Sequence, residues 1–404
     1  MDAIIKVIDD WSMAIDNNES MTAIFFDFAK AFDLVDHDIL LTKLTRLLPD
    51  YLTSWIASYL INRKQRVRIH DIETEWKNVE AGVIQGSVLG PTLFILFISD
   101  INEYLPSNAE IEKYADDILG YLIGNAIGRL PQDIVDGINR WCIANKMKLN
   151  TKKCKIIFTP GSAAEQPPKL YLNGEELEIV ESYRYLGIEI NNKLDWSQQW
   201  NRILKNTNSV PFLVKQLKRL GFNKDILTTV YKSLFVSHID YNSPILISAT
   251  CEIKAQINSV QNRLLKIIGI DKKEALEKFN IENINDRIER MSLKRVSKLL
   301  ADPKNAVSMK YKNVDRSNSL FRFKTKKART KIYNDSVVQK CIRTIRDDYS
   351  KQELYRLISP RTIEYEKGAV KIEKIKVECP NCNKMFEAKT GIKIHRRKCP
   401  TKPL

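Results

Sequence analysis

Tyr114-Ala115-Asp116-Asp117 places two adjacent carboxylates between residues 111–113 and the apolar run at residues 118–123. Short apolar segments on both sides of a tight polar pair predict a β-hairpin. Carboxylates at a hairpin tip can bind a hard cation through their oxygens, and such cations drive phosphoryl and nucleotidyl transfer. An Asp pair is also common in turns and helix caps, so this stretch needs support from elsewhere in the chain.

A second carboxylate, Asp27, ends the β-branched and aromatic run at residues 22–27, and a helical pattern follows at residues 39–48. A buried strand that ends in an Asp before a helix is a recurrent way of placing a metal ligand at the edge of a sheet. Asp27 and Asp116 are far apart in the sequence, so only a sheet that pairs their strands would bring them together. The alternative is an ordinary Asp at a strand end or a helix N-cap.

A glycine-rich loop, residues 82–91 (GVIQGSVLGP), precedes an apolar helical run. Glycines let a backbone approach a ligand closely, and Pro91 suits the first turn of the helix that follows. A buried helix with a glycine-rich entry is the alternative explanation, because glycine loops serve many purposes.

Together, in this order, the three segments resemble the palm of a reverse transcriptase, in particular that of non-LTR (LINE-type, jockey-like) retrotransposons. The matching segments are residues 26–37, 85–91, 114–117, 141–158 and 185–188, the last resembling the family's primer-grip segment. The resemblance covers roughly residues 1–200 with specific motifs and extends more loosely into the helical stretch beyond. One departure is Ile84, where the family usually has proline.

This resemblance implies a two-metal catalytic site. Asp27 and Asp116 would be the principal ligands of two Mg²⁺ ions, with Asp117 as their neighbour. One ion would activate the primer 3′-hydroxyl, and the other would hold the triphosphate and stabilise the leaving pyrophosphate. Mg²⁺ prefers one or two protein carboxylates together with substrate phosphates and water, which agrees with these assignments.

The resemblance also implies a set of substrate-binding residues. Phe32 would lie under the incoming sugar and exclude a 2′-hydroxyl, with plain core packing as the alternative. Gln85 and Gly86 would lie beside the incoming nucleotide and the template base, and Tyr114 would also contact substrate. Lys153 would aid proton transfer to the pyrophosphate, unless it only belongs to a solvated face of neighbouring lysines.

Charge is segregated along the chain. Residues 1–200 contain 20 Lys and Arg against 29 Asp and Glu, residues 201–300 contain 18 against 9, and residues 301–404 contain 27 against 11. An acidic catalytic half followed by a basic half suits an enzyme that holds a polyanion. The partners that the resemblance implies are an RNA template, a DNA primer or target, and dNTPs.

Hydrophobic periodicity predicts an α+β fold, with an antiparallel palm sheet and packed helices followed by a helical thumb. We expect strands at residues 22–27, 66–70, 111–122 and 154–158 and in a hairpin at Asn173-Gly174, and helices near residues 37–48, 51–61, 91–104 and 130–147. The palm is predicted to occupy residues 1–195, the thumb residues 196–300 and a basic linker or helical region residues 301–376. Within that region, residues 302–335 are interpreted as a linker, a nucleic-acid patch, a nuclear localisation signal or a solvated loop.

A small zinc-binding module is predicted at residues 377–401. Cys379, Cys382, His395 and Cys399 have a C-x2-C-x12-H-x3-C spacing. Thiolate and imidazole ligands at this spacing suit a tetrahedral structural zinc. The segment resembles a C2H2 finger whose last His is replaced by Cys, and so short a module would need the metal to fold. A chance cluster in the tail is the alternative.

Two classes of function remain open. One is an RNA-directed DNA polymerase, and the other is a catalytically inactive fragment that only binds nucleic acid through its basic thumb and zinc finger. The chain starts shortly before Asp27, so the family's upstream fingers and endonuclease are expected to be absent. No secretory signal is evident, and the longest apolar segment, residues 88–98, is too short to span a bilayer. We therefore expect an intracellular protein, in the nucleus or the cytoplasm, without a membrane partner; nothing in the sequence indicates its oligomeric state.

Overall fold

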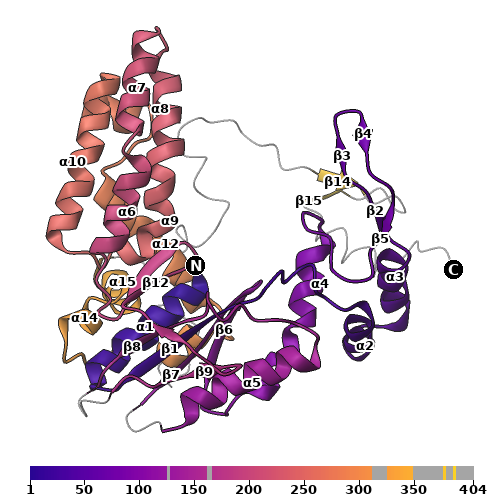
Figure 1. Cartoon of the computed structure of the whole chain (residues 1–404). Helices are drawn as coiled ribbons and strands as arrows, with labels where there is room; N and C mark the ends of the chain where they lie inside the picture. The colour runs from indigo at the N-terminus through magenta and orange to yellow at the C-terminus, as the bar shows by residue number, and fades with distance from the viewer. Residues whose placement is uncertain (125–127, 162–165, 312–324, 349–375, 379–384, 388–404) are drawn as a thin grey trace. The chain divides into compact units, whose positions relative to one another are not determined.

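The computed structural model describes residues 1–124, 128–161, 166–311, 325–348, 376–378 and 385–387 (Figure 1). The chain divides into two compact units, residues 1–350 and 351–404. In the second unit the described residues form one antiparallel hairpin, β14 (Lys376–Glu378) paired with β15 (Met385–Glu387). All other elements belong to the first unit.

A five-stranded sheet lies at the centre of the first unit, in the order β11-β8-β1-β7-β6. Its strands are β1 (Met21–Asp27), β6 (Glu110–Tyr114), β7 (Asp117–Ile123), β8 (Lys155–Thr159) and β11 (Glu178–Ile179). All neighbours run antiparallel except β11 and β8. β1 is central and has six buried residues out of seven, which explains its largely apolar and aromatic composition. The predicted α+β class, the hairpin at residues 111–122 and the strands near residues 22–27 and 154–158 are confirmed.

Helices cover both faces of this sheet. One face packs on α4 (Leu89–Phe97), the 3₁₀ helix η1 (Ser99–Tyr104) and α5 (Leu130–Ala144) in a single apolar core. The opposite face receives α1 (Asp2–Asn17), where the Trp11 indole N–H donates to the Thr159 hydroxyl over 2.9 Å. The single helix predicted near residues 91–104 is divided into α4 and η1 in the structure, and α1 lies in a stretch for which no element was predicted.

The segment between β1 and α4 contains two helices and two short antiparallel ladders. Its elements are α2 (His37–Leu47), α3 (Asp50–Leu60), β2 (Lys64–Gln65), β3 (Arg68–Ile69), β4 (Ile72–Glu73) and β5 (Lys77–Asn78). The two predicted helices are confirmed. The single strand predicted at residues 66–70 is wrong, because the chain forms two short ladders, β2 with β5 and β3 with β4, whose residues are all exposed. Without a buried face, an apolar pattern does not extend a strand.

Short hairpins connect the sheet to the helical region. The predicted Asn173-Gly174 turn joins β9 (Tyr171–Leu172) to β10 (Glu175–Glu176), and both turn residues have positive φ. A second hairpin pairs β12 (Ser182–Tyr185) with β13 (Ile188–Asn191). The β12–β13 hairpin covers the end of β1.

The chain is helical from residue 197 to residue 301, as predicted. The helices are α6 (Ser197–Thr207), α7 (Val210–Arg219), α8 (Lys224–Tyr231), the π-helical turn η2 (Lys232–Val236), α9 (Ser237–Leu246), α10 (Cys251–Ile268), α11 (Lys272–Glu277) and α12 (Ile284–Ala301). Figure 1 shows α7, α8 and α10 side by side, in agreement with their mutual contacts. None of the helices in the described residues is long and apolar enough to cross a membrane.

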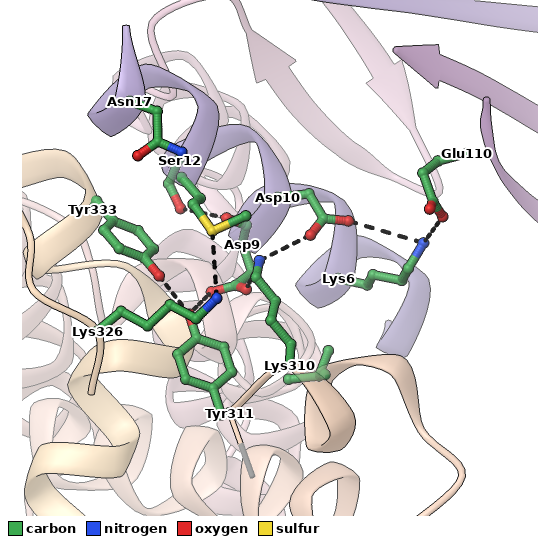
Figure 2. A network of polar contacts seen from close by, with 12 residues as sticks. Lys6, Asp9, Asp10, Ser12, Asn17, Glu110, Lys310, Tyr311, Lys326 and Tyr333 are labelled. Carbon is green, nitrogen blue, oxygen red and sulfur yellow. Dashed lines mark hydrogen bonds and ion pairs between the residues drawn. The ribbon is translucent and has the colours of Figure 1, made fainter. Parts of the chain in front are cut away.

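The residues after α12 return to α1 and pack on it. They form α13 (Ala306–Tyr311), α14 (Lys331–Asn334) and α15 (Val337–Asp348). Figure 2 shows the contact: the Lys310 ammonium lies 2.5 Å from the Asp9 carboxylate and 2.9 Å from that of Asp10. The Tyr311 hydroxyl donates to Asp9 over 2.7 Å and also contacts the Tyr333 hydroxyl at 3.1 Å.

Helix α1 also binds the basic stretch that precedes α14. The backbone N–H groups of Arg329 and Thr330 both donate to the Asp16 carboxylate, over 2.7 and 2.5 Å. The backbone N–H of Lys326 donates to the Gln339 amide of α15 over 3.1 Å. In its described part, the segment interpreted as a linker, a nucleic-acid patch, a nuclear localisation signal or a solvated loop is therefore docked on α1 and α15, with backbone N–H groups bound to Asp16 and Gln339 and the Lys310 and Tyr311 side chains bound to Asp9 and Asp10.

Candidate active site

The β-sheet places Asp27 directly opposite Asp117. The two residues are the last partners in the antiparallel register of β1 and β7. Directly opposite residues have Cα atoms about 4.5–5.5 Å apart and point to the same face of the sheet. The two carboxylates, which are 90 positions apart in the sequence, are therefore neighbours in the fold, and the predicted pairing of their strands is confirmed.

Asp116 lies in the tight turn between β6 and β7. Tyr114 pairs with Asp117, so Ala115 and Asp116 form a two-residue hairpin loop. Ala115 has φ 52, a left-handed conformation that costs a non-glycine residue about 1–2 kcal/mol. Such strain persists where the surrounding structure enforces it, and it is often found at functional sites. The turn keeps Asp116 next to the Asp27–Asp117 pair.

The three carboxylates repel one another. Partial burial raises the pKa of Asp117, and the charges of Asp116 and then Asp27 raise it further. Asp27 Oδ1 is buried and has no hydrogen-bond partner. The Lys153 ammonium is 3.5 Å from this oxygen, which is a charge contact too long for a good hydrogen bond. The site thus holds excess negative charge and an oxygen without a donor, both of which favour a cation.

These residues fit a divalent ion that takes few protein ligands. Among the residues that the structure describes, no group of three or more His, Cys, Asp or Glu side chains is already gathered as a ligand set. Mg²⁺ does not require one, since it is usually bound by one or two carboxylates and completes its shell with phosphate oxygens and water. Asp27 and Asp117, with Asp116 beside them, can supply that number.

The β12–β13 hairpin lies over the carboxylates. The Tyr183 ring stacks on Phe25 of β1 with ring centroids 4.3 Å apart. Burial raises the pKa of Tyr183, and Asp27 and Asp117 raise it further. Burial likewise raises the pKa of Tyr185, followed by the charges of Glu112 and Asp117. Sequence reasoning missed Tyr183; the signal that could have found it is its alternation with Tyr185 in the strand.

The helical region anchors the turn of this hairpin. Leu186 and Gly187 both have positive φ, of 47 and 81. The Tyr241 hydroxyl of α9 donates to the Leu186 carbonyl over 2.6 Å. A Cβ at Gly187 would lie 3.6 Å from the Tyr241 ring. The position of the segment that resembles a primer grip is therefore set partly by α9.

The glycine-rich loop packs beside the segment that follows β1. The Gly82 N–H donates to the Val35 carbonyl over 2.7 Å, and the Gln85 amide donates to the Asp33 carboxylate over 3.1 Å. Gly86 is exposed with φ 79, and a Cβ there would meet nothing within 4 Å. By contrast, a Cβ at Gly90 would lie 2.3 Å from the Ile84 carbonyl oxygen. Gly90 is thus required for the loop to fold, whereas Gly86 leaves open space for a ligand.

The remaining predicted substrate residues surround the same region. Phe32 is half-buried and stacks on Phe94 with ring centroids 4.8 Å apart, so core packing accounts for only part of its surface. Tyr114 is 59% exposed at the end of β6. Lys153 follows a turn in which the Asn150 N–H donates to the Asp27 carbonyl over 2.8 Å, which places the lysine beside Asp27.

The predicted zinc ligands Cys379, Cys382, His395 and Cys399 lie outside the described residues. The described hairpin flanks the first two of them, since β14 ends at Glu378 and β15 begins at Met385.

Comparison with known proteins identifies the domain that contains this sheet. Residues 4–190 match the family model described as reverse transcriptase (RNA-dependent DNA polymerase). The RNA-directed DNA polymerase from mobile element jockey of Drosophila melanogaster is 25% identical over 316 residues, which are 74% of this chain and 34% of that protein. Its counterpart of Drosophila funebris is 31% identical over 199 residues, 47% of this chain and 22% of that protein.

Two further similarities are more limited. The probable RNA-directed DNA polymerase from transposon X-element of Drosophila melanogaster is 26% identical over 279 residues, 65% of this chain and 30% of that protein. The apo telomerase structure from Candida tropicalis has a TM-score of 0.39 at 10% identity, covering 72% of this chain and 50% of that one, which is too remote to support an argument. The chain spans about a third or less of the length of the mobile-element polymerases it matches. Residues 4–190 therefore form a reverse transcriptase domain with carboxylates paired across its central strands, and the chain is similar to the RNA-directed DNA polymerases of mobile elements such as jockey and X-element.

Proposed function

We propose that this protein is an RNA-directed DNA polymerase that extends a DNA primer on an RNA template. The observation that carries the proposal is the pairing of Asp27 with Asp117, with Asp116 in the adjoining strained turn. Three repelling carboxylates at the end of a sheet are an arrangement suited to divalent ions and triphosphates rather than to stability. The mobile-element relatives, which bear the name RNA-directed DNA polymerase, support this assignment.

Asp27, Asp116 and Asp117 would hold the two Mg²⁺ ions of the reaction. Bound there, such ions lower the pKa of the primer 3′-hydroxyl and neutralise charge on the triphosphate. Lys153, whose ammonium lies 3.5 Å from Asp27 Oδ1, is positioned to give a proton to the leaving pyrophosphate.

The incoming nucleotide would lie between the glycine-rich loop and the β6–β7 turn. Gln85 is held by Asp33 beside the end of β1, and Gly86 leaves its backbone open to a close approach. Tyr114 projects from the neighbouring strand with most of its side chain exposed. Template and primer would be held by the basic part of the chain, because residues 201–404 carry the excess of Lys and Arg.

A primer-extension assay tests this function. The chain is supplied with an RNA template, an annealed DNA primer, dNTPs and Mg²⁺, and the primer length is followed. We expect magnesium-dependent products longer than the primer. Retained nucleic-acid binding with no such product would instead favour the second function considered from the sequence, that of an inactive nucleic-acid-binding fragment.

Phe32→Val is expected to relax the choice of sugar. If the Phe32 ring lies under the deoxyribose, its removal makes room for a 2′-hydroxyl, and ribonucleotide use relative to deoxynucleotide use should rise about 10–100-fold. Single-nucleotide extension with dNTP and rNTP in parallel measures this ratio. Phe94→Leu is the matched control, because it disturbs the same 4.8 Å stack from the core side. An equal change in both variants would reduce Phe32 to a core residue.

Cys382→Ser is expected to remove a structural zinc. We propose that Cys379, Cys382, His395 and Cys399 bind one ion, following their spacing in the sequence. Metal analysis of the purified chain should fall from about one equivalent of zinc to none, since loss of one thiolate leaves an incomplete tetrahedral set. Cys251→Ser, which removes an exposed thiol of α10, should leave the zinc content unchanged. Full zinc in the Cys382 variant would contradict the assignment.

A further inference from the structure

A cavity of about 410 Å³ lies where α1, the β13–α6 connection, the start of α10, α14 and α15 meet. It shares no lining residue with the carboxylate site or the glycine-rich loop. Cavities of this size are typical of sites for small ligands. The lining contains both a cluster of cations and an apolar wall, and the polymerase function makes no use of it.

Four lysines line this cavity: Lys193, Lys254, Lys331 and Lys340. The ammonium groups of Lys254 and Lys340 both donate to the Ile247 carbonyl, over 2.7 and 2.9 Å, so two cations are held side by side by one neutral oxygen. Within the described part of the chain, none of the four lysines has a carboxylate partner at salt-bridge distance. Burial, and then the charge of Lys340, lower the pKa of Lys254 to about 8.

The two carboxylates that line the cavity are already engaged. Asp195 accepts a hydrogen bond from the Ser197 N–H over 2.7 Å at the start of α6. Asp335 lies 3.6 Å from the Arg343 guanidinium of α15. The lining therefore holds four lysines against two carboxylates, and although the charge of Asp335 raises the pKa of Lys254, burial and Lys340 outweigh it. Like charges held this close are costly unless an anion joins them.

Two serine hydroxyls of the lining are also unsatisfied. The Ser248 and Ser336 oxygens are buried without a hydrogen-bond partner, and Ser336 is only 3% exposed. A buried hydroxyl without a partner costs about 1–3 kcal/mol, and an oxygen of a bound ligand would supply the missing partner. Hydroxyl and ammonium donors together match the oxygens of a phosphate group.

The opposite wall is apolar. Leu194 and Trp196 lie on the β13–α6 connection, and Ile332 comes from α14. Trp196 is buried to all but 6% of its surface. An apolar wall of this kind accepts a flat or hydrophobic body, so the ligand that fits both walls is amphipathic, with a phosphate at one end.

We propose that this cavity binds a nucleotide, with its phosphate at the Lys254–Lys340 pair and the Ser336 hydroxyl and its base on the Leu194–Trp196 wall. The nucleotide comes either from a free mononucleotide or from the 5′-phosphorylated end of a nucleic-acid strand. Both sources present the same chemistry to the cavity. The site is separate from polymerisation, so its failure would leave the proposed function untouched.

The first test measures binding of fluorescently labelled AMP to the full chain without Mg²⁺, by fluorescence anisotropy. Lys254→Gln with Lys340→Gln should weaken binding at least about tenfold, because two charge-assisted donors are lost. Lys218→Gln is the matched control: its ammonium also donates to a backbone carbonyl, that of Ile267 over 2.8 Å, but it lies outside the cavity. Affinity should also fall between pH 7 and pH 9, as Lys254 loses its proton beside Lys340, and this fall should disappear in the double variant.

A second test does not depend on the Lys254–Lys340 pair. Cys251 begins α10, lines the cavity and is exposed, so AMP should slow its alkylation, as followed by mass spectrometry of its peptide. Lys193→Gln with Lys331→Gln changes two exposed rim residues and should reduce this protection severalfold without affecting folding.

The source of the nucleotide is decided by comparing AMP with a short oligonucleotide, either 5′-phosphorylated or unphosphorylated. Protection by AMP indicates a free nucleotide, and protection only by the phosphorylated strand indicates a strand end. Protection by neither, or affinity equal in the wild-type chain and the Lys254/Lys340 double variant, would overturn the proposal.

Discussion

Asp27→Asn should abolish primer extension while leaving the protein folded. Asn keeps the shape of the side chain but removes the charge that faces Asp117 across the sheet. Losing several kilocalories per mole of metal-dependent transition-state stabilisation should lower the rate by about a thousandfold or more. Asp116→Asn should have the same effect. Rates from single-turnover extension at saturating primer–template measure the change.

The melting temperature separates this role from a structural one. Burial, and then the charges of Asp116 and Asp27, raise the pKa of Asp117, so its charged form disfavours the folded state. Removing one charge should leave the melting temperature of the metal-free protein unchanged or slightly higher. Asp38→Asn, which removes an exposed carboxylate in the first turn of α2, should leave the rate unchanged and cost at most about 1 kcal/mol of stability, the contribution of an acid at a helix N-terminus. Synthesis within tenfold of wild type would remove Asp27 from the site.

Lys310→Met should destabilise the first unit by about 3–5 kcal/mol, the usual cost of leaving a buried charge without its partner. Asp9 is fully buried on α1, and its carboxylate accepts from both Lys310 and Tyr311. With Lys310 gone, the carboxylate must be desolvated with only a hydroxyl and more distant groups to stabilise it. Chemical denaturation, monitored by tryptophan fluorescence, measures the free energy of unfolding.

The charge states of Asp9 and Lys310 determine the pH at which the free energy of unfolding should be measured. Burial raises the pKa of Asp9, which favours its neutral form, whereas Asp9 and Asp10 raise the pKa of Lys310 although burial opposes them. We take the ion pair as the folded state, because the Lys310 ammonium lies within 2.9 Å of both carboxylates. A raised lysine pKa contributes stability that is complete below the ordinary lysine pKa and is lost as the pH rises above it. The full effect is therefore expected at pH 7.

A double variant identifies the cause of the loss. Asp9→Asn combined with Lys310→Met removes both charges and keeps an oxygen that can accept from Tyr311, so most of the lost stability should return. Lys327→Met, an exposed lysine of the neighbouring basic stretch, should change stability by less than about 0.5 kcal/mol. If the double variant were as unstable as Lys310→Met alone, the buried charge would not be the reason.

Local chemistry was predictable wherever one stretch of chain contained the whole signal. The run at residues 22–27 is apolar because β1 is buried on both faces, and the turn at Ala115-Asp116 is flanked by segments that pair with each other. The prediction of a strand at residues 66–70 was wrong because no buried face supports a strand there. An apolar sequence pattern therefore predicts a strand correctly only where the fold buries the apolar residues.

By itself, the sequence determined which elements form along the palm and which residue types carry the chemistry: carboxylates at Asp27, Asp116 and Asp117, and an open glycine at Gly86. Only the tertiary structure decided that Asp27 faces Asp117, that Tyr183 covers them, and that Asp9 is a core residue bound to Lys310, which lies 301 positions away. The physical reason is that a charged side chain in an amphipathic helix has the same local pattern whether water or a distant partner solvates it. Which of the two occurs depends on contacts between residues far apart in the sequence, and hydrophobic periodicity does not report such contacts.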